Sequence, residues 1–219
     1  MSNREPLRQR LRAGLTALKL DLDDSTVERQ LDYVELLLRW NAAYNLTAVR
    51  DPGEMITRHL LDSLAVLPHV SGTSLADLGT GAGIPGIPLA LARPELEVQL
   101  VDSNGKKARF LREAVRHLKL ARVRVVESRV EAVEGEFDCI TARAFATLAD
   151  MLGWAGHLLK PEGRWLALKG RFPQDELDAL PSGFVIEAVH RLEVPGLDAE
   201  RHLVIIKRSQ DLAAAGTHS

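Results

Sequence analysis

The sequence predicts an α/β fold, in which a doubly wound, mostly parallel, seven-stranded sheet carries an N-terminal helical cap. Three observations support this prediction. Apolar residues recur at helical spacing before residue 70, short apolar strands alternate with helices from residue 73 onward, and the last two apolar runs have the pattern of a hairpin. Alternating strands and helices are typical of a parallel sheet with helices on both faces.

The same patterns divide the chain into three parts. Residues 1–70 are expected to form a helical extension packed on the core, and residues 71–208 the sheet domain. The small, polar residues 209–219 are expected to form a disordered tail. With 46% hydrophobic and 26% charged residues, the chain has the balance of an ordinary globular protein that can bury a core.

Composition also excludes several kinds of protein and site. The single cysteine, Cys139, rules out an intrachain disulfide, and the seven scattered histidines show no metal-ligand spacing, so we expect no metal. The basic residues 1–12 have no apolar segment behind them, and no apolar run reaches the roughly 18 residues of a membrane span. We therefore expect a soluble, cytoplasmic protein that has no membrane partner.

The N-terminal part contains three helical patterns. The first is a single apolar face made by Leu7, Leu11, Leu15 and Leu18. The second begins at Ser25-Thr26-Val27-Glu28, which matches a capping box, and is expected to end near Trp40. The third begins with Asp51 as the cap and Pro52 at the first helical position, and is expected to end at about Leu67.

The sheet domain is expected to alternate in a regular way. Strands are predicted at 74–78, 97–101, 123–126, 137–141, 164–169, 184–192 and 202–207. Helices are predicted at 85–92, 106–118, 148–159 and 175–180. We expect Pro161-Glu162-Gly163 to be a turn before the fifth strand, and the last two strands to form a hairpin with a long connection.

A glycine-rich loop follows the first predicted strand. Asp77 is followed by glycines at alternate positions, Gly79, Gly81 and Gly83, which allow a sharp turn and let a ligand approach the backbone. In such sheets a ligand binds outside the carboxyl ends of the strands. The pattern Asp-Leu-Gly-x-Gly-x-Gly is typical of proteins that bind S-adenosylmethionine, so we predict that Asp77 and the three glycines bind this cofactor.

The same loop also allows a different prediction. Gly81-Ala82-Gly83-Ile84-Pro85-Gly86 matches G-x-G-x-x-G, and Asp102 lies 21 residues after Gly81, where a dinucleotide enzyme has its ribose-binding acid. An acid at the end of the second strand suits the ribose of either cofactor. The loop therefore favours a methyltransferase but leaves open an NAD-dependent oxidoreductase.

The residues after the fourth strand bear on the substrate. No Asn- or Asp-Pro-Pro-aromatic loop, which methylation of an adenine amine would call for, is present. Cys139 lies inside an apolar strand, which favours a buried small hydrophobe over a nucleophile. Arg143 and Phe145 suit hydrogen bonding to a base and stacking on it, although Phe145 also fits a core position.

Charge is distributed unevenly along the chain. The net charge is -2, which argues against a generic nucleic-acid binder. Residues 101–130, however, hold nine Lys or Arg and three acids, a local charge of +6. Two interpretations stay open: a basic surface that meets a phosphate backbone, or a solvated helix face.

Seven stretches, in order along almost the whole chain, resemble one family. They are Trp40–Thr47, Arg58–Leu64, Asp77–Pro88, Asp102–Lys107, Ser128–Glu131, Ala142–Phe145 and Glu200–Leu203. Together they are similar to the RsmG family, also called glucose-inhibited division protein B, the guanine-N7 methyltransferases of bacterial 16S ribosomal RNA. The resemblance implies a Rossmann-like class I methyltransferase fold that uses S-adenosylmethionine.

The resemblance also implies a division of labour among residues. Gly79 and Ile84 would contact the methyl donor, Asp102 its ribose, and Val130 and Glu131 its adenine. The catalytic cleft would contain Arg143, beside the methionine end of the cofactor and the target base, together with Arg129, Asn45 and His59. The residues that would face RNA are Lys106, Lys107, Lys169 and Arg201.

Other interpretations of these residues stay open. Asn45 could cap the preceding helix, and His59 could be a core histidine. The implied partner is 16S rRNA near the decoding site, within the small subunit or its precursor, and we expect a monomer. Loss of the family is associated with streptomycin resistance. A non-catalytic ribosome-assembly factor with the same fold is a further alternative.

Overall fold

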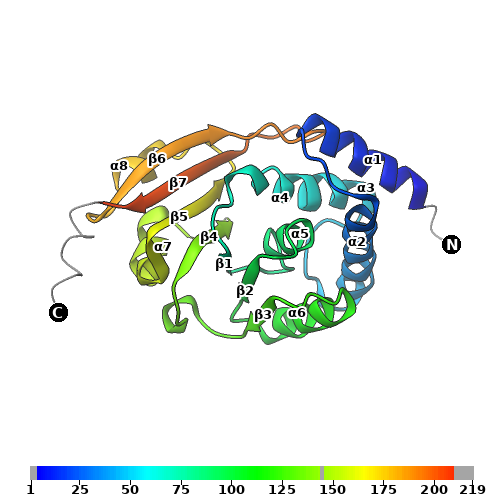
Figure 1. Cartoon of the computed structure of the whole chain (residues 1–219), viewed down its shortest axis with the longest axis horizontal. Helices are drawn as coiled ribbons and strands as arrows, with labels where there is room; N and C mark the ends of the chain where they lie inside the picture. Colours follow the sequence, from blue (N-terminus) through cyan, green and yellow to red (C-terminus); the bar gives the residue numbers. More distant parts are fainter. Residues whose placement is uncertain (1–3, 144–145, 210–219) are drawn as a thin grey trace.

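The computed structural model describes residues 4–143 and 146–209, which contain one seven-stranded sheet in the order β3-β2-β1-β4-β5-β7-β6 (Figure 1). The strands are β1 Ser74–Leu78, β2 Glu97–Val101, β3 Val123–Val126, β4 Phe137–Arg143, β5 Leu159–Lys169, β6 Phe184–Arg191 and β7 His202–Arg208. Strands β1 to β5 are parallel, and β7 runs antiparallel to both β5 and β6. The predicted mostly parallel sheet with a final hairpin is confirmed.

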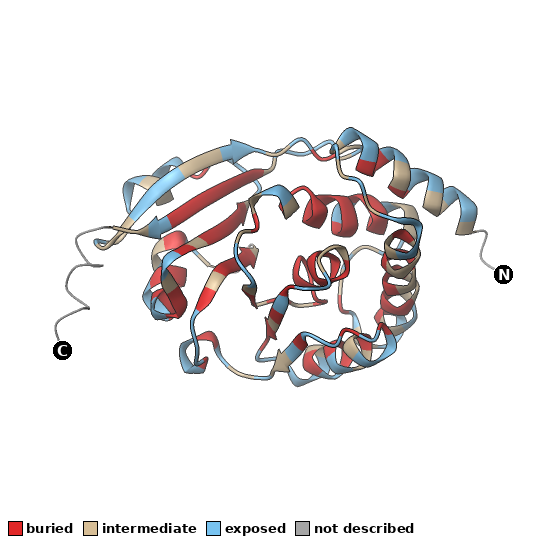
Figure 2. Cartoon of the chain, viewed as in Figure 1, coloured by how far each residue is buried: buried red, intermediate tan, exposed pale blue. Residues whose placement is uncertain are grey.

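The helices bury two separate apolar clusters, one on each face of the sheet. The buried residues of the strands and helices are red in Figure 2. Along β1, Leu75 belongs to one cluster and Ala76 to the other, as the two-residue period of a strand requires. The larger cluster lies under α1 Arg4–Ala17, α2 Asp24–Tyr44, α4 Asp62–Leu64, α5 Gly86–Ala92 and α6 Gly105–His117. The smaller one lies under α7 Leu148–Ala155. The remaining helix of the sheet domain, α8, spans Gln174–Asp178.

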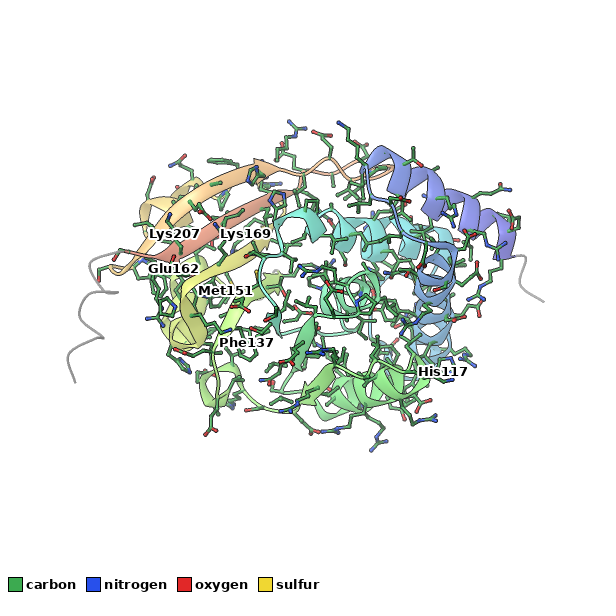
Figure 3. The ribbon with its side chains drawn as sticks, viewed as in Figure 1. His117, Phe137, Met151, Glu162, Lys169 and Lys207 are labelled. Atoms are coloured by element: carbon green, nitrogen blue, oxygen red, sulfur yellow. The ribbon has the colours of Figure 1, made fainter. Side chains whose placement is uncertain are left out.

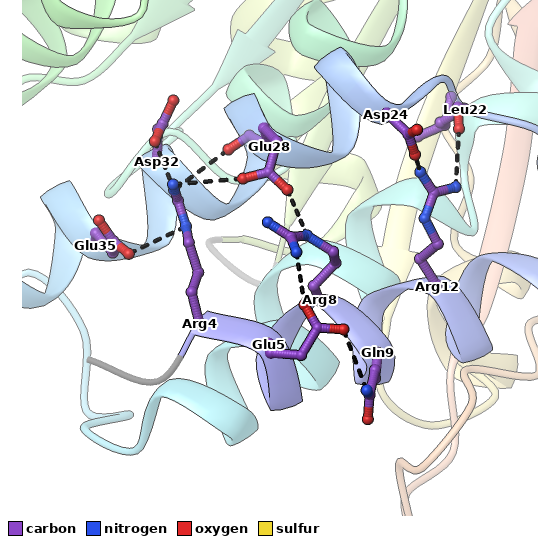
Figure 4. Close-up of polar contacts among 10 residues, drawn as sticks. All are labelled: Arg4, Glu5, Arg8, Gln9, Arg12, Leu22, Asp24, Glu28, Asp32 and Glu35. Carbon is purple, nitrogen blue, oxygen red and sulfur yellow. Dashed lines mark hydrogen bonds and ion pairs between the residues drawn. The ribbon is translucent and has the colours of Figure 1, made fainter. Parts of the chain in front are cut away.

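Helices α1 and α2 are joined by arginine–carboxylate pairs near the surface (Figure 4). Arg4 lies 2.5 Å from Asp32 and 3.2 Å from Glu35, and Arg8 lies 2.6 Å from Glu28. Partly exposed pairs of this kind contribute about 0–1 kcal/mol each. The main attachment of α1 is therefore the burial of its apolar face, which includes Leu11 and Leu15.

The predicted capping box of the second helix is wrong. The cap is Asp23, whose carboxylate accepts the Thr26 N–H at 2.6 Å, and this hydrogen bond lowers the pKa of Asp23. An aspartate two residues before Ser25 can satisfy the orphan N–H groups, so the helix begins earlier. Glu28 instead binds Arg8. The helix also runs past Trp40 to Tyr44, and Asn45 ends it.

The third helix begins as predicted but changes its hydrogen-bond pattern. Asp51 caps α3, which spans Pro52–Met55, by accepting the Glu54 N–H at 2.8 Å. Residues Ile56–Leu61 then form a π-helix, η1, followed by α4 and by a 3₁₀ turn at Leu67–His69. π-Helical turns are rare, occur mostly within α-helices and are frequent at functional sites. The continuous α-helix predicted for this segment is therefore wrong in its middle.

The predicted turn at Pro161-Glu162-Gly163 is also wrong. Strand β5 begins at Leu159 and runs through these residues, while α7 ends at Ala155 and a 3₁₀ turn follows. A Cβ on Gly163 would lie 2.9 Å from the Phe137 carbonyl oxygen, so glycine lets β5 approach β4 where their pairing shifts register. Proline and glycine mark an irregular strand here rather than a break.

In the ranges 4–143 and 146–209, every helix is too short or too polar to span a membrane.

Tyr33 connects the helical part to the rest of the fold. This fully buried side chain of α2 donates its hydroxyl hydrogen to the Ala82 carbonyl oxygen at 2.9 Å, within the glycine loop.

Replacing Tyr33 with Phe is expected to lower the free energy of unfolding by about 1 kcal/mol or more, because the Ala82 carbonyl would stay buried without its donor. Chemical denaturation measures the change. Tyr44→Phe, a partly exposed position at the end of the same helix, is the matched control and should change stability by less than about 0.5 kcal/mol. Equal effects of the two substitutions would contradict the role of this hydrogen bond.

Candidate functional site

The glycine loop lies between β1 and α5, at the carboxyl edge of the sheet. Gly79 and Gly81 have φ angles of +65° and +61°, a region that L residues rarely adopt. A Cβ on Gly81 would meet only the Gly79 carbonyl oxygen, 4.0 Å away, so this part of the loop borders open space. The backbone of the loop is thus accessible to a ligand at the position that the motif predicts.

Asp77, at the end of β1, holds the loop in place from below. One carboxylate oxygen accepts the Thr80 hydroxyl hydrogen in a short contact and the Gly86 N–H at 2.8 Å, and the other accepts the Thr141 hydroxyl hydrogen at 2.9 Å. Burial raises the pKa of Asp77 to about 6. Asp77 is fully buried and its oxygens are bound by the protein, so it organises the loop, and its predicted contact with a cofactor stays a prediction.

Gly83 likewise faces the protein interior. A Cβ at this position would lie 2.4 Å from Ile87 Cδ1 and 3.1 Å from Leu111 Cδ2. Glycine is needed here for close packing against α5 and α6, and the predicted ligand contact of Gly83 stays a prediction. Ile84, whose peptide bond to Pro85 is cis, is buried at the start of α5, and its contact with the methyl donor stays a prediction.

Asp102 follows β2 and lies directly beside the loop. Its carboxylate accepts the Gly81 N–H at 2.9 Å and the Asn104 N–H at 2.9 Å, and Lys107 Nζ lies 3.6 Å away. Asn104 in turn caps α6 by accepting the N–H groups of Lys106 and Lys107. The acid predicted to bind a ribose is therefore placed against the accessible part of the loop.

The next strand end carries the residues expected around the adenine. Val130 and Glu131 form a 3₁₀ turn, η3, which spans Val130–Ala132 just after β3. Val130 is buried, whereas Glu131 and the preceding Arg129 are exposed. All three lie at the same edge of the sheet as Asp102, because β2 and β3 are adjacent and parallel. Their individual contacts stay predictions.

A buried carboxylate joins two of the predicted arginines. Asp62, which follows the π-helix and is 1% exposed, lies 3.2 Å from Arg143 Nη1 and 3.0 Å from Arg201 Nε. Arg143 Nη1 also donates to the Arg58 carbonyl oxygen at 3.4 Å. Hydrogen bonds between charged groups are about twice as strong as neutral ones. Arg201 belongs to this ion-pair network, and its predicted contact with RNA stays a prediction.

His59 is brought next to this network by the π-helix. It is 3% exposed, its Nε2 lies 3.0 Å from Thr47 Oγ1, and its Nδ1 has no hydrogen-bond partner within the described part of the chain. Desolvation lowers the pKa of His59 to about 4, so the ring is neutral at pH 7. The histidine anchors the segment after α2 and presents one unpartnered ring nitrogen.

Asn45 ends α2 in the left-handed conformation, with a φ of +50°. Its N–H donates to the Asn41 carbonyl oxygen, and its side-chain oxygen accepts a hydrogen bond from Arg50 at 2.8 Å. The capping interpretation of Asn45 is therefore right for the backbone. The side chain is exposed, and its catalytic role stays a prediction.

Lys169, which lies at the end of β5 (Figure 3), forms a hydrogen bond and an ion pair within the protein. Its Nζ donates to the Ala146 carbonyl oxygen at 3.0 Å and lies 2.7 Å from Glu176 Oε2, and its side chain is only 11% exposed. These contacts fix the segment after β4 against α8, and the predicted contact of Lys169 with RNA stays a prediction. Phe145, the other residue predicted near the base, lies outside the described residues.

The basic segment 101–130 contains both arginines paired with nearby acids and cations without such partners among the described residues. Arg112, Arg116 and Arg122 form ion pairs with Glu127, Glu113 and Glu97. Lys106 and Arg109 are exposed, and no ion pair of either is found within residues 4–143 and 146–209. Part of the segment is a self-paired helix surface, and part leaves cations free for an anionic partner.

Three residues of the site were missed by sequence reasoning: Asp62, Thr80 and Thr141. Asp62 offered one usable signal, an acid within the apolar run Leu60-Leu61-Asp62-Ser63-Leu64. A charged residue on a buried helix face requires a partner. The two threonines carry no comparable signal, since hydroxyl groups are common in strands and loops.

Comparisons with known proteins agree on one family. Residues 26–204 match the family described as GidB, rRNA small subunit methyltransferase G. A protein of Xanthomonas euvesicatoria pv. vesicatoria named ribosomal RNA small subunit methyltransferase G is 56% identical over 200 residues, 90% of this chain and 93% of the relative. The protein of that name from Neisseria meningitidis serogroup C is 52% identical over 203 residues, 92% of this chain and 98% of the relative.

Solved structures agree on the fold. The chain is similar to TrmN from Thermus thermophilus, with a TM-score of 0.58 and 23% identity over 70% of this chain and 53% of TrmN, about half its length. It is also similar to M. capricolum TrmK in complex with S-adenosyl-homocysteine, with a TM-score of 0.55 and 14% identity over 67% of each chain. The fold is a Rossmann-like methyltransferase fold.

The buried Asp77 carboxyl predicts a specific pH dependence of stability. Its pKa is raised from 3.8 to about 6 on folding, so between these values the folded chain holds a proton that the unfolded chain has lost. The contribution of Asp77 to the free energy of unfolding therefore falls as pH rises through this window, by on the order of 3 kcal/mol. Asp77→Asn should gain stability relative to the wild type from pH 4 to 6 in denaturation experiments; a pH-independent difference would contradict this.

Proposed function

Because the chain belongs to the rRNA small subunit methyltransferase G family, we propose that it transfers a methyl group from S-adenosylmethionine to N7 of a specific guanine in 16S ribosomal RNA, near the decoding site. The chain is a methyltransferase that acts on small-subunit rRNA. The methyl donor, the guanine and the nitrogen atom are the proposed part. We also propose that the enzyme acts as a monomer on the subunit or its precursor.

One observation carries the proposed cofactor: the accessible backbone at Gly81 lies against the Asp102 carboxylate. A Cβ at Gly81 would point into open space, and the Gly81 N–H is held by Asp102 at 2.9 Å. A carboxylate beside an exposed glycine loop suits the ribose hydroxyls of an adenosine. Gly81 and Asp102 therefore fit the adenosine part of the proposed cofactor. In the proposed complex, S-adenosylmethionine supplies an electrophilic methyl group on its sulfonium.

The NAD alternative conflicts with the order of the strands. A dinucleotide-binding sheet has the order 3-2-1-4-5-6, whereas here the antiparallel β7 lies between β5 and β6. In the dinucleotide fingerprint the second glycine lets the backbone approach the pyrophosphate, whereas Gly83 is packed against Ile87. Only the first glycine of that match faces open space.

The chemistry requires positioning rather than proton transfer. Guanine N7 carries a free lone pair at neutral pH, so no general base is needed, and most of the rate should come from alignment. The base becomes positively charged on methylation. We expect Arg143 at O6, at a phosphate or at the donor carboxylate rather than directly against N7; Asp62 offsets part of its charge, and the neutral His59 adds none. These three residues therefore suit a site where positive charge develops.

The assembly-factor alternative has a direct test. Mapping 7-methylguanosine in 16S rRNA from cells with the gene, without it, and with Arg143→Ala should show one modified guanine only with the wild-type gene. Adenosylhomocysteine, but not NAD, should also raise the melting temperature of the purified protein. An unchanged modification map would refute the proposed function, and a map retained by Arg143→Ala would refute the role of Arg143.

The ion-pair network predicts a second result. Asp62→Asn should lower kcat by about 100-fold, because Arg143 loses the carboxylate that orients it, and a misplacement of 1 Å costs about that much. Asp62→Glu, which keeps the charge, should recover part of the rate. Asp198→Asn, the same change at an exposed position, is the control. A normal kcat for Asp62→Asn in a folded protein would contradict the positioning role.

A further inference from the structure

We propose that the loop after β5 carries a stacking site for one unpaired nucleotide of the RNA substrate, with the Phe172 ring as the platform and Arg171 as the phosphate contact. The proposal rests on the proposed function, because it concerns how the rRNA is held. It involves a surface separate from the glycine loop. None of the residues predicted to bind cofactor lines it.

Phe172 is 50% exposed, and its ring is oriented by the protein. The ring meets the buried His202 edge-on, with centroids 5.5 Å apart and an interplanar angle of 85°. A hollow of about 360 Å³, lined by residues 169–176, opens beside it. An aromatic ring that is held by one contact, is half exposed and lines a hollow suits the stacking of a flat ligand.

The loop after β5 leaves the sheet at its carboxyl edge, where Arg143 and the glycine loop also lie. Arg143 is paired with Leu168 and Lys169 with His202, so the loop leaves the sheet at the edge where Arg143 lies. His202 directly follows Arg201, which shares Asp62 with Arg143. A nucleotide held on Phe172 would therefore be a near neighbour of the target base.

The charges favour a single nucleotide over an extended phosphate surface. Glu176 is compensated by Lys169 at 2.7 Å. Arg171 is exposed, and no ion pair of its guanidinium occurs in the described ranges, while Asp175 also lines the hollow. With these charges nearly balanced, binding would depend on stacking, and Arg171 would add one phosphate contact.

A single aromatic ring also argues against a protein partner. Within residues 4–143 and 146–209, the other large exposed hydrophobic residues are Trp154, Val185 and Ile186. Val185 is paired with Lys207, at the opposite end of the β5–β7 pair from Lys169 (Figure 3). Protein interfaces bury contiguous apolar patches, whereas one aromatic ring beside one arginine matches the recognition of an unstacked base.

The test is a kinetic comparison on small ribosomal subunits at saturating S-adenosylmethionine. Phe172→Ala should raise KM for the subunit about tenfold and leave kcat within about twofold, whereas Phe172→Trp should retain a KM close to that of the wild type. Val185→Ala, a truncated exposed side chain far from the loop, is the matched control. Arg171→Ala should reduce the slope of the logarithm of the binding constant against the logarithm of salt concentration by about 0.7.

Each outcome decides the proposal. A normal KM for Phe172→Ala, an equal rise with Val185→Ala, or a loss confined to kcat would overturn the stacking site. Melting temperatures of all variants show whether they are folded. If the wild-type protein does not methylate the subunit, the proposed function is wrong. If the wild-type protein methylates the subunit and Phe172→Ala has the same KM, only the stacking site is wrong.

Discussion

The site depends on one buried carboxylate, that of Asp77. It joins the end of β1 to the glycine loop through Thr80, to the start of α5 through the Gly86 N–H, and to β4 through Thr141. A Cβ on Gly86 would lie 2.8 Å from the same carboxylate, so the helix can begin there only with glycine. Burying an acid is unfavourable unless its oxygens are satisfied, and here each oxygen has a donor. The accessible backbone at Gly81 follows from this arrangement.

A second buried acid, Asp62, forms ion pairs with two arginines, Arg143 and Arg201. The π-helix Ile56–Leu61 places it, together with His59, against the ends of β4 and β7. The extra residue per turn of a π-helix rotates later side chains relative to earlier ones. Two arginines far apart in sequence can thus share one carboxylate. This network fixes the position of Arg143 at the carboxyl edge of the sheet, and the Asp62 carboxylate offsets one of the two arginine charges.

Local patterns predicted the parallel sheet, its hairpin and the place of the glycine loop, because hydrophobic period and glycine spacing are local properties. The same patterns failed where contacts between residues far apart in sequence determine where a helix begins or whether a strand continues. Asp23 rather than Ser25 caps α2, and Gly163 continues β5 because β4 approaches closely. The pairing of Asp62 with Arg143 and Arg201 joins positions 81 and 139 residues apart, and no local pattern specifies it.

The helical part contributes to the site directly instead of only covering the sheet. Tyr33 of α2 is hydrogen-bonded to the glycine loop, His59 reaches Thr47, and Asp62 holds Arg143. The apolar cluster on that face is continuous from Leu11 to Ile205. A change in how these helices pack would therefore move the loop and Arg143 together. Because methyl transfer to N7 depends on alignment, the stability of the helical packing and the rate of the reaction should be coupled.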